Sequence, residues 1–227
     1  MSTTTVFPDP DTESTSVDGR AAHDQANQTI STLVAAVGNF ASDTETTGPV
    51  SLMDAGTTTD RYNTIARGFF LFDTSAIDDG DAISSATFSL YVTSLTNTLS
   101  GEASANSAMV LVSSAPASNT AIVAGDYDTQ GSTSFGTSDT QDNLSTSAYN
   151  DITLNASGLA NISKTGISKF ATRSGWDFND TATGLTWSSG ATQRILASLA
   201  EQTDTTQDPK LVIQHAAVTF IPRAIII

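Results

Sequence analysis

Few side chains in this sequence have the chemistry that enzyme mechanisms require. The chain has no cysteine and two histidines, His23 in a polar stretch and His215 after an apolar run. General acid–base and nucleophilic roles need oriented partners, so we expect both histidines to be ordinary surface or edge residues. No G-x-S-x-G, H-E-x-x-H or P-loop motif occurs, and the sequence favours a protein that is not an enzyme. A glycosidase pair of aspartates stays open, because its separation in space is not visible in a sequence.

Clusters of aspartate are the best candidates for binding a metal ion. The clusters are Asp9 with Asp11, Asp78 with Asp79 and Asp81, Asp126 with Asp128, and Asp177 with Asn179 and Asp180. None of them matches the helix–loop–helix calcium loop, and aspartate also simply forms turns. No cofactor is therefore firmly expected, and Ca²⁺ is the one cation that the carboxylates favour. Its first candidate ligands are Asp9, Asp11, Asp177 and Asp180.

Two tryptophans and one arginine are the remaining candidates for ligand contacts. Trp176 and Trp187 stand among glycine, serine and aspartate, where an exposed aromatic face could stack on a sugar. The alternative is that both pack in the core or at its edge. Arg67 stands beside a phenylalanine-rich run, where a buried charge must be paired. We expect it to pair with a carboxylate, such as Asp73 or an aspartate in a loop, instead of a ligand.

The composition excludes some classes of partner. The formal net charge is -15, with nine Lys plus Arg against 24 Asp plus Glu, and such a charge repels nucleic-acid phosphates. Only 15% of residues are charged, so serine, threonine, asparagine, glutamine and glycine must cover most of the surface. The first residues do not resemble a secretory signal, and no run approaches the roughly 20 apolar residues that span a bilayer. We expect no membrane insertion, and release with a phage particle at lysis is one route to the outside.

The strands expected to form the core of the domain lie within residues 65–93. The run from Gly68 to Phe72 has the length and composition of a strand that is buried on both faces. The run 86–93 alternates, with Ala86, Phe88, Leu90 and Val92 on one side, which is typical of a half-buried strand. The cluster 78–81 forms a turn between them. We expect these two runs to be paired core strands of an all-β domain.

The rest of the chain supplies further short strands and turns. The pattern predicts strands over 2–8, 50–54, 108–112, 149–154, 165–172 and 208–215. Residues 30–37 and 193–199 fit either a strand or a helical turn, and a strand is favoured for the first. Surface loops are expected over 12–29 and 118–146, and a short helix over 156–162 with Asn155 as its N-cap. The predicted fold class is all-β, an antiparallel two-sheet sandwich, jelly-roll-like, with at most one short helix.

Three stretches resemble one known family. They run over residues 67–77, 82–91 and 208–213, and they read RGFFLFDTSAI, AISSATFSLY and DPKLVI. These motifs are similar to those of the DNRLRE-type domain, also called the disaggregatase-related repeat, which includes carbohydrate-binding module family 96. The chain departs from that pattern at Asp79, where the family often has proline. The resemblance implies an antiparallel jelly-roll-like sandwich with an extracellular, non-catalytic role.

The last residues differ from the domain that precedes them. We expect residues 1–215 to form a single domain and residues 216–227 to form a hydrophobic tail. The tail carries the predicted assembly residues Phe220, Ile221, Ile225, Ile226 and Ile227. A β-branched run at a free end invites strand pairing, so the tail is expected either to dock on a neighbouring subunit or to fold back on its own sandwich. Its sequence also resembles the tails of phage and environmental virus structural proteins.

These features together predict a non-enzymatic structural protein on the surface of a virion. It would be a capsid decoration protein or a tail-associated protein, and it would attach through its terminal segments. The expected partners are neighbouring virion subunits, further copies of the chain in a homo-oligomer, and a glycan on the host surface. The alternative is a carbohydrate-binding module of an adhesin or of a polysaccharide-degrading system.

Overall fold

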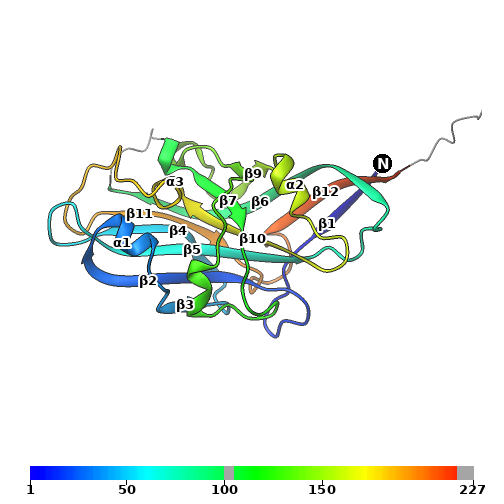
Figure 1. The fold of residues 1–227 in the computed structure, drawn as a ribbon, viewed down its shortest axis with the longest axis horizontal. Helices are drawn as coiled ribbons and strands as arrows, with labels where there is room; N and C mark the ends of the chain where they lie inside the picture. The colour runs from blue at the N-terminus through cyan, green and yellow to red at the C-terminus, as the bar shows by residue number, and fades with distance from the viewer. Residues whose placement is uncertain (100–104, 219–227) are drawn as a thin grey trace, which may run out of the picture.

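The computed structural model describes residues 1–99 and 105–218 of the chain (Figure 1). These residues form one curled antiparallel sheet with three short α-helices and three 3₁₀ turns. The strands are β1 (Ser2–Val6), β2 (Asp18–Gln28), β3 (Phe40–Ser42), β4 (Thr47–Ala55), β5 (Tyr62–Asp73), β6 (Asp81–Asn97), β7 (Met109–Ser113), β8 (Gly136–Thr137), β9 (Ala148–Thr153), β10 (Ile167–Ser174), β11 (Thr192–Ser198) and β12 (Lys210–Ala217). The helices are α1 (Ile30–Val34), α2 (Ala156–Ala160) and α3 (Gly175–Phe178), and the 3₁₀ turns are η1 (Ala105–Ser107), η2 (Ala124–Asp128) and η3 (Gln141–Asn143).

Strand β5 is the centre of the sheet. It pairs with β2, β4 and β10, and the phenylalanine-rich run along it is buried on both faces, as the sequence predicts. Phe70 and Phe72 point into one hydrophobic core, which we call the main core. Phe69 and Leu71 point into a second core on the other face. A strand with apolar side chains on both sides therefore holds the two cores together.

Strand β6 confirms the predicted alternation but not the predicted pairing. Its inward side chains lie in the main core, whereas β12, β11 and β9 are its hydrogen-bonded neighbours. β5 instead faces β6 across the main core, where the ring of Phe88 lies 5.1 Å from Phe70 and 6.1 Å from Phe72, centroid to centroid. The turn after Asp73 thus carries the chain from one layer of the sandwich to the other.

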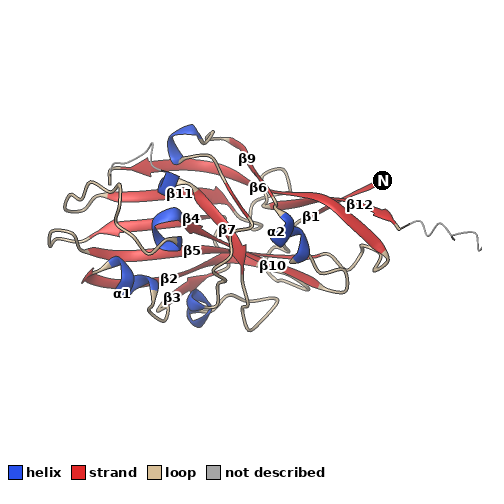
Figure 2. Ribbon diagram, turned by 45° about the horizontal axis from the view of Figure 1, so that its top comes forward, coloured by secondary structure: helices blue, strands red, loops and turns tan. Residues whose placement is uncertain are grey.

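The sheet curls into two layers, so the predicted all-β, antiparallel, sandwich-like fold is confirmed. Its strand order is β1-β12-β6-β11-β4-β5-β10-β7-β8, with β2 on β5, β3 on β2 and β9 on β6. The long strands follow the long axis of the molecule (Figure 2). The second core lies on the outer face of β5 and β10, beneath α1, η2 and α3.

Two predictions about local structure are wrong. Residues 12–29 are not one long loop, because Asp18 to Asp24 pair with β5 along their backbone. The side chains of β2 are small or polar, and only Asp24, Gln25 and Ala26 are exposed. Residues 30–34 form a helix instead of a strand. Thr29 accepts a hydrogen bond from the backbone of Thr32 and caps that helix, and Ile30 and Leu33 share its buried face. The predicted single helix is therefore one of three, and Asn155 caps its α2 as expected.

Candidate functional site

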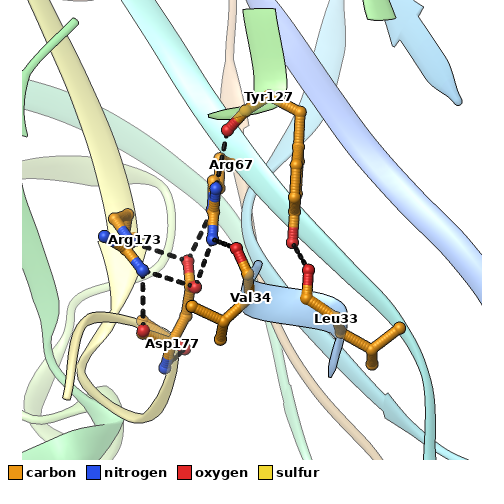
Figure 3. A network of polar contacts seen from close by, with 7 residues as sticks. Leu33, Val34, Arg67, Tyr127, Arg173 and Asp177 are labelled. Atoms are coloured by element: carbon orange, nitrogen blue, oxygen red, sulfur yellow. Dashed lines mark hydrogen bonds and ion pairs between the residues drawn. The ribbon is translucent and has the colours of Figure 1, made fainter. Parts of the chain in front are cut away.

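A buried network of charges lies on the outer face of β5 (Figure 3). The guanidinium of Arg67 donates to both carboxylate oxygens of Asp177, at 2.8 and 2.6 Å. Arg173 donates to the same two oxygens at 3.0 and 2.8 Å. Burial alone would raise the pKa of Asp177, but the two arginines hold that pKa below its usual value. The aspartate is thus a fully enclosed anion between two cations.

The same network joins distant elements. Arg67 also donates to the backbone oxygens of Tyr127 and Val34, at 2.6 and 3.1 Å. Its guanidinium lies 3.9 Å from the centre of the Tyr127 ring, and the Tyr127 hydroxyl donates to Leu33 at 2.8 Å. These contacts connect five elements of the fold: β5, β10, α3, η2 and α1. Each of the three guanidinium nitrogens of Arg67 donates to a protein oxygen, so the arrangement stabilises the fold.

This network tests two predictions made from the sequence, namely the partner of Arg67 and the proposed calcium ligand Asp177. Arg67 is paired with a carboxylate, as expected, but the partner is Asp177 of helix α3, which is neither Asp73 nor a loop aspartate. The prediction of a calcium ligand at Asp177 is wrong, because both of its oxygens are occupied by arginines. Asp180 lies on the surface beyond α3 and is not part of the network.

The other predicted calcium ligands lie in the loop before β2. One oxygen of Asp9 accepts from the backbone and side chains of Ser14 and Thr15 and from the backbone of Ser16, which closes that loop on itself. Burial raises the pKa of Asp9, but these hydrogen bonds lower it more. Asp11 is exposed. Within residues 1–99 and 105–218, no three histidine, cysteine, aspartate or glutamate side chains converge as a metal site requires.

The two tryptophans have different surroundings. Trp176 is fully buried in the second core, so the core-packing alternative is confirmed for it and the sugar-stacking alternative is wrong. Its indole nitrogen donates to Thr183 at 3.0 Å. Trp187 is only partly buried, packs against the second core, and donates to the backbone oxygen of Arg61 at 2.9 Å. Of the pair, Trp187 alone keeps part of its surface open to a ligand.

A hydroxyl, an imidazole and a carboxylate line up where the ends of the chain meet. The Thr4 hydroxyl lies 2.8 Å from Nε2 of His215, and Nδ1 of His215 lies 2.5 Å from a carboxylate oxygen of Asp81. The order of groups is that of a hydrolase triad. Thr4, however, has a secondary hydroxyl in the middle of a strand that pairs with β12 along its whole length. We therefore assign these contacts to fastening β1, β12 and β6, and no local motif in the sequence could have revealed them.

A cluster of carboxyl groups lies between the loop before β2 and the loop before β12. Asp18 is fully buried and accepts from the backbone nitrogen of Ala200 at 3.2 Å. Buried oxygens of Glu13, Glu201 and Asp208 have no hydrogen-bond partner. No described ion pair includes any of these four residues. Unpaired carboxylates of this kind favour the protonated form.

The pKa values of this carboxyl cluster follow from its burial. Burial, with repulsion from Glu13 and Asp43, raises the pKa of Glu201 to about 7. Burial and repulsion from Asp204 raise the pKa of Asp208 to about 6. Burial and repulsion from Glu201 and Asp208 raise the pKa of Asp18 well above its ordinary value. The cluster thus takes up protons in a mildly acidic solution.

The predicted assembly residues Phe220, Ile221, Ile225, Ile226 and Ile227 lie outside the described residues. Strand β12 does continue through Ala217, two residues into the predicted tail. None of the helices in the described part of the chain has the length and apolar content needed to cross a membrane. Comparison with known proteins found no matching family model and no matching curated protein.

Proposed function

We propose that this chain is a non-enzymatic structural protein of a virion surface, either a capsid decoration protein or a tail-associated protein. Its DNRLRE-type sandwich would be displayed, and its terminal segments would attach it to neighbouring subunits. The observation that carries the proposal is the pairing of β1 with β12. Ser2 lies opposite His215, so both ends of the described chain leave the sandwich at the same end (Figure 1).

This geometry suits a module that is held at one end and presented at the other. Strand β6 begins opposite Ala217, next to the termini, and runs 17 residues to Asn97. At about 3.3 Å per residue it extends for about 50 Å, so its far end lies well away from the attachment. The contacts of His215 with Thr4 and Asp81 stabilise the end that would be attached to neighbouring subunits.

Deletion of residues 218–227 tests the attachment. The β-branched tail would dock on a neighbouring subunit by strand addition or by filling a groove, so the shortened chain should fold but fail to enter particles. The measurement is the amount of the chain in purified particles, with circular dichroism as the check on folding. Trp187→Phe, a change remote from the paired β1 and β12 strands, is the matched control and should be incorporated normally. Normal incorporation of the deletion variant would contradict the proposal.

Carbohydrate binding is the second candidate function. The partly open ring of Trp187 favours it, because an aromatic face can stack on the C–H groups of a sugar. Trp187 follows α3 and bonds to the segment just before β5, at the end of the sandwich opposite the paired termini. The two candidate functions are compatible, since a displayed module could present a glycan-binding end to a host.

A further inference from the structure

Strand β1 has one free edge. It pairs with β12 through all five of its residues, from Ser2 opposite His215 to Val6 opposite Leu211, and the register contains no bulge. β1 is the last strand in the order of the sheet. Among the residues that the structure describes, no segment other than β12 makes a backbone hydrogen bond to it. The backbone groups on the other side of β1 are therefore open to a further strand.

This edge lacks the features with which soluble proteins prevent strand addition. Natural edge strands are usually very short, or they contain charged residues, proline or a bulge. In the described sheet, the other strands with a single partner are β3 with three residues, β8 with two residues, and β9, which contains Asp151. β1 has five residues and contains neither a charge nor a proline. Ser2, Thr3 and Thr5 are exposed, so β1 is an unprotected edge.

The sequence that follows β12 is suited to pair with such an edge. β12 ends at Ala217, and Val218 is 62% exposed. Residues 219–227 lie outside the described part of the chain, and after Pro222 their sequence reads Arg-Ala-Ile-Ile-Ile. β-branched side chains favour strands, and a proline that precedes the paired residues does not interrupt their hydrogen bonds. Residues 223–227 alone provide as many residues as β1 offers for pairing.

A neighbouring copy is a better donor of this segment than the same copy. Because His215 lies opposite Ser2, β12 runs past the first residue of β1 on the side that it already occupies. The segment after β12 would have to turn back around Met1 to reach the free edge of its own β1, whereas a second copy can present it without that reversal. Charge also favours a second copy, since Arg223 brings a positive charge to a chain whose net charge is -15.

We propose that residues 223–227 of one copy add as a strand to the free edge of β1 in a neighbouring copy. Backbone hydrogen bonds supply the affinity in this mode of binding, and alternate side chains supply the specificity. Val6 is only partly buried where it packs on the main core, so isoleucines of the added strand would extend that core. The inference rests on the proposed attachment through terminal segments, and it names the partner as a second copy and the acceptor as β1.

Disulfide cross-linking of the full chain tests this contact, because the sequence has no cysteine of its own. Thr5→Cys marks the exposed edge of β1 in one preparation. Ile225→Cys, Ile226→Cys and Ile227→Cys mark the donor segment in separate preparations. Each donor is mixed with the acceptor under mild oxidation, and mass spectrometry identifies the linked peptides. A disulfide requires Cα atoms within about 7 Å of each other, so a docked segment forms one efficiently.

We expect at least one donor to link to Thr5→Cys. The yield should be about tenfold higher than with the control acceptor, because docking raises the effective concentration of the two sulfur atoms. The control acceptor is Thr59→Cys, which replaces another exposed threonine, in the turn between β4 and β5. Linking that is equally weak with both acceptors would overturn the inference.

Two other results would also overturn it. If Thr5→Cys links mainly to a second Thr5→Cys, the occupant of the edge is another β1 strand. If a chain that carries both Thr5→Cys and Ile226→Cys links mainly within itself, the segment folds back on its own sandwich.

This inference and the virion proposal can fail separately. Cross-links at β1, together with normal entry of the chain lacking residues 218–227 into particles, would contradict the virion proposal alone. Failure of that shortened chain to enter particles, without cross-links at β1, would contradict this inference alone.

Discussion

Asp177 balances the charge of two arginines beside the second core. The sequence shows that the arginine beside the phenylalanine run needs a carboxylate, because a buried guanidinium cannot stay unpaired. It does not show which one, since Asp177 is 110 positions away and belongs to a helix of one turn. Asp73 is only six residues from Arg67 but is not its partner. Local patterns thus predict the need for a partner but not its identity.

Replacement of Asp177 by asparagine should destabilise the protein strongly. The change removes the negative charge between Arg67 and Arg173, and loss of one partner from a buried ion pair costs about 3–5 kcal/mol. Urea denaturation followed by circular dichroism measures the free energy of unfolding. Asp180→Asn is the matched control, because Asp180 is exposed and asparagine tolerates its positive φ of 47°. A loss below about 1 kcal/mol for Asp177→Asn would contradict the structural role of the network.

At the element scale, the strands with apolar patterns are predictable and the others are not. β5 and β6 have unmistakable patterns because their own side chains form the cores. β2 has no such pattern, because it is held by backbone bonds to β5 and contributes small or polar side chains. Helix α1 depends on one threonine N-cap and two buried apolar residues. This pattern is too short to distinguish a helix from a strand in the sequence. The sequence likewise shows the individual aspartates and glutamates, but it does not predict that two distant loops bring four of them together in the carboxyl cluster.

The two loops that share the carboxyl cluster should make stability depend on pH. The pKa values of Glu201 and Asp208 are raised to about 7 and about 6, so the folded chain holds protons that the unfolded chain releases. The unfolded state then binds fewer protons, and the free energy of unfolding falls as pH rises from about 4.5 to about 7. Asp177 acts oppositely, because its lowered pKa removes stability as the solution becomes more acidic than its ordinary value of 3.8. Maximal stability is therefore expected near pH 4–5.

Thermal melting at constant ionic strength from pH 4.5 to pH 8 checks this dependence, with the melting temperature expected to fall. Glu201→Gln imitates the protonated group, so it should raise the melting temperature at the alkaline end and flatten the slope. Glu45→Gln is the matched control, because Glu45 is paired with Arg20 on the surface side of β2 and has no part in the cluster. A melting temperature that increases steadily over this range would contradict the assignment.

At the scale of the whole molecule, the fold class is predictable while the positions of the ends are not. Apolar and alternating runs are sufficient to predict an antiparallel all-β sandwich. The curl that places β5 opposite β6, and the register that brings Ser2 beside His215, depend on pairings between distant segments. A cavity beside Asn97 depends on the same curl, because β6 and η3 line it together. The spacing of residues in the sequence predicts neither the meeting of the two ends nor the cavity.

In the proposed role, the sandwich is held by its paired termini and presents its opposite end. Electron cryomicroscopy of purified particles tests it most directly, because the long strands mark the direction of the molecule in a density map. The proposal predicts β1 and β12 against neighbouring subunits, and the far end of β6 at the outermost surface. Particles that lack the chain, or in which the Asn97 end is buried against the particle while the termini point outward, would contradict it.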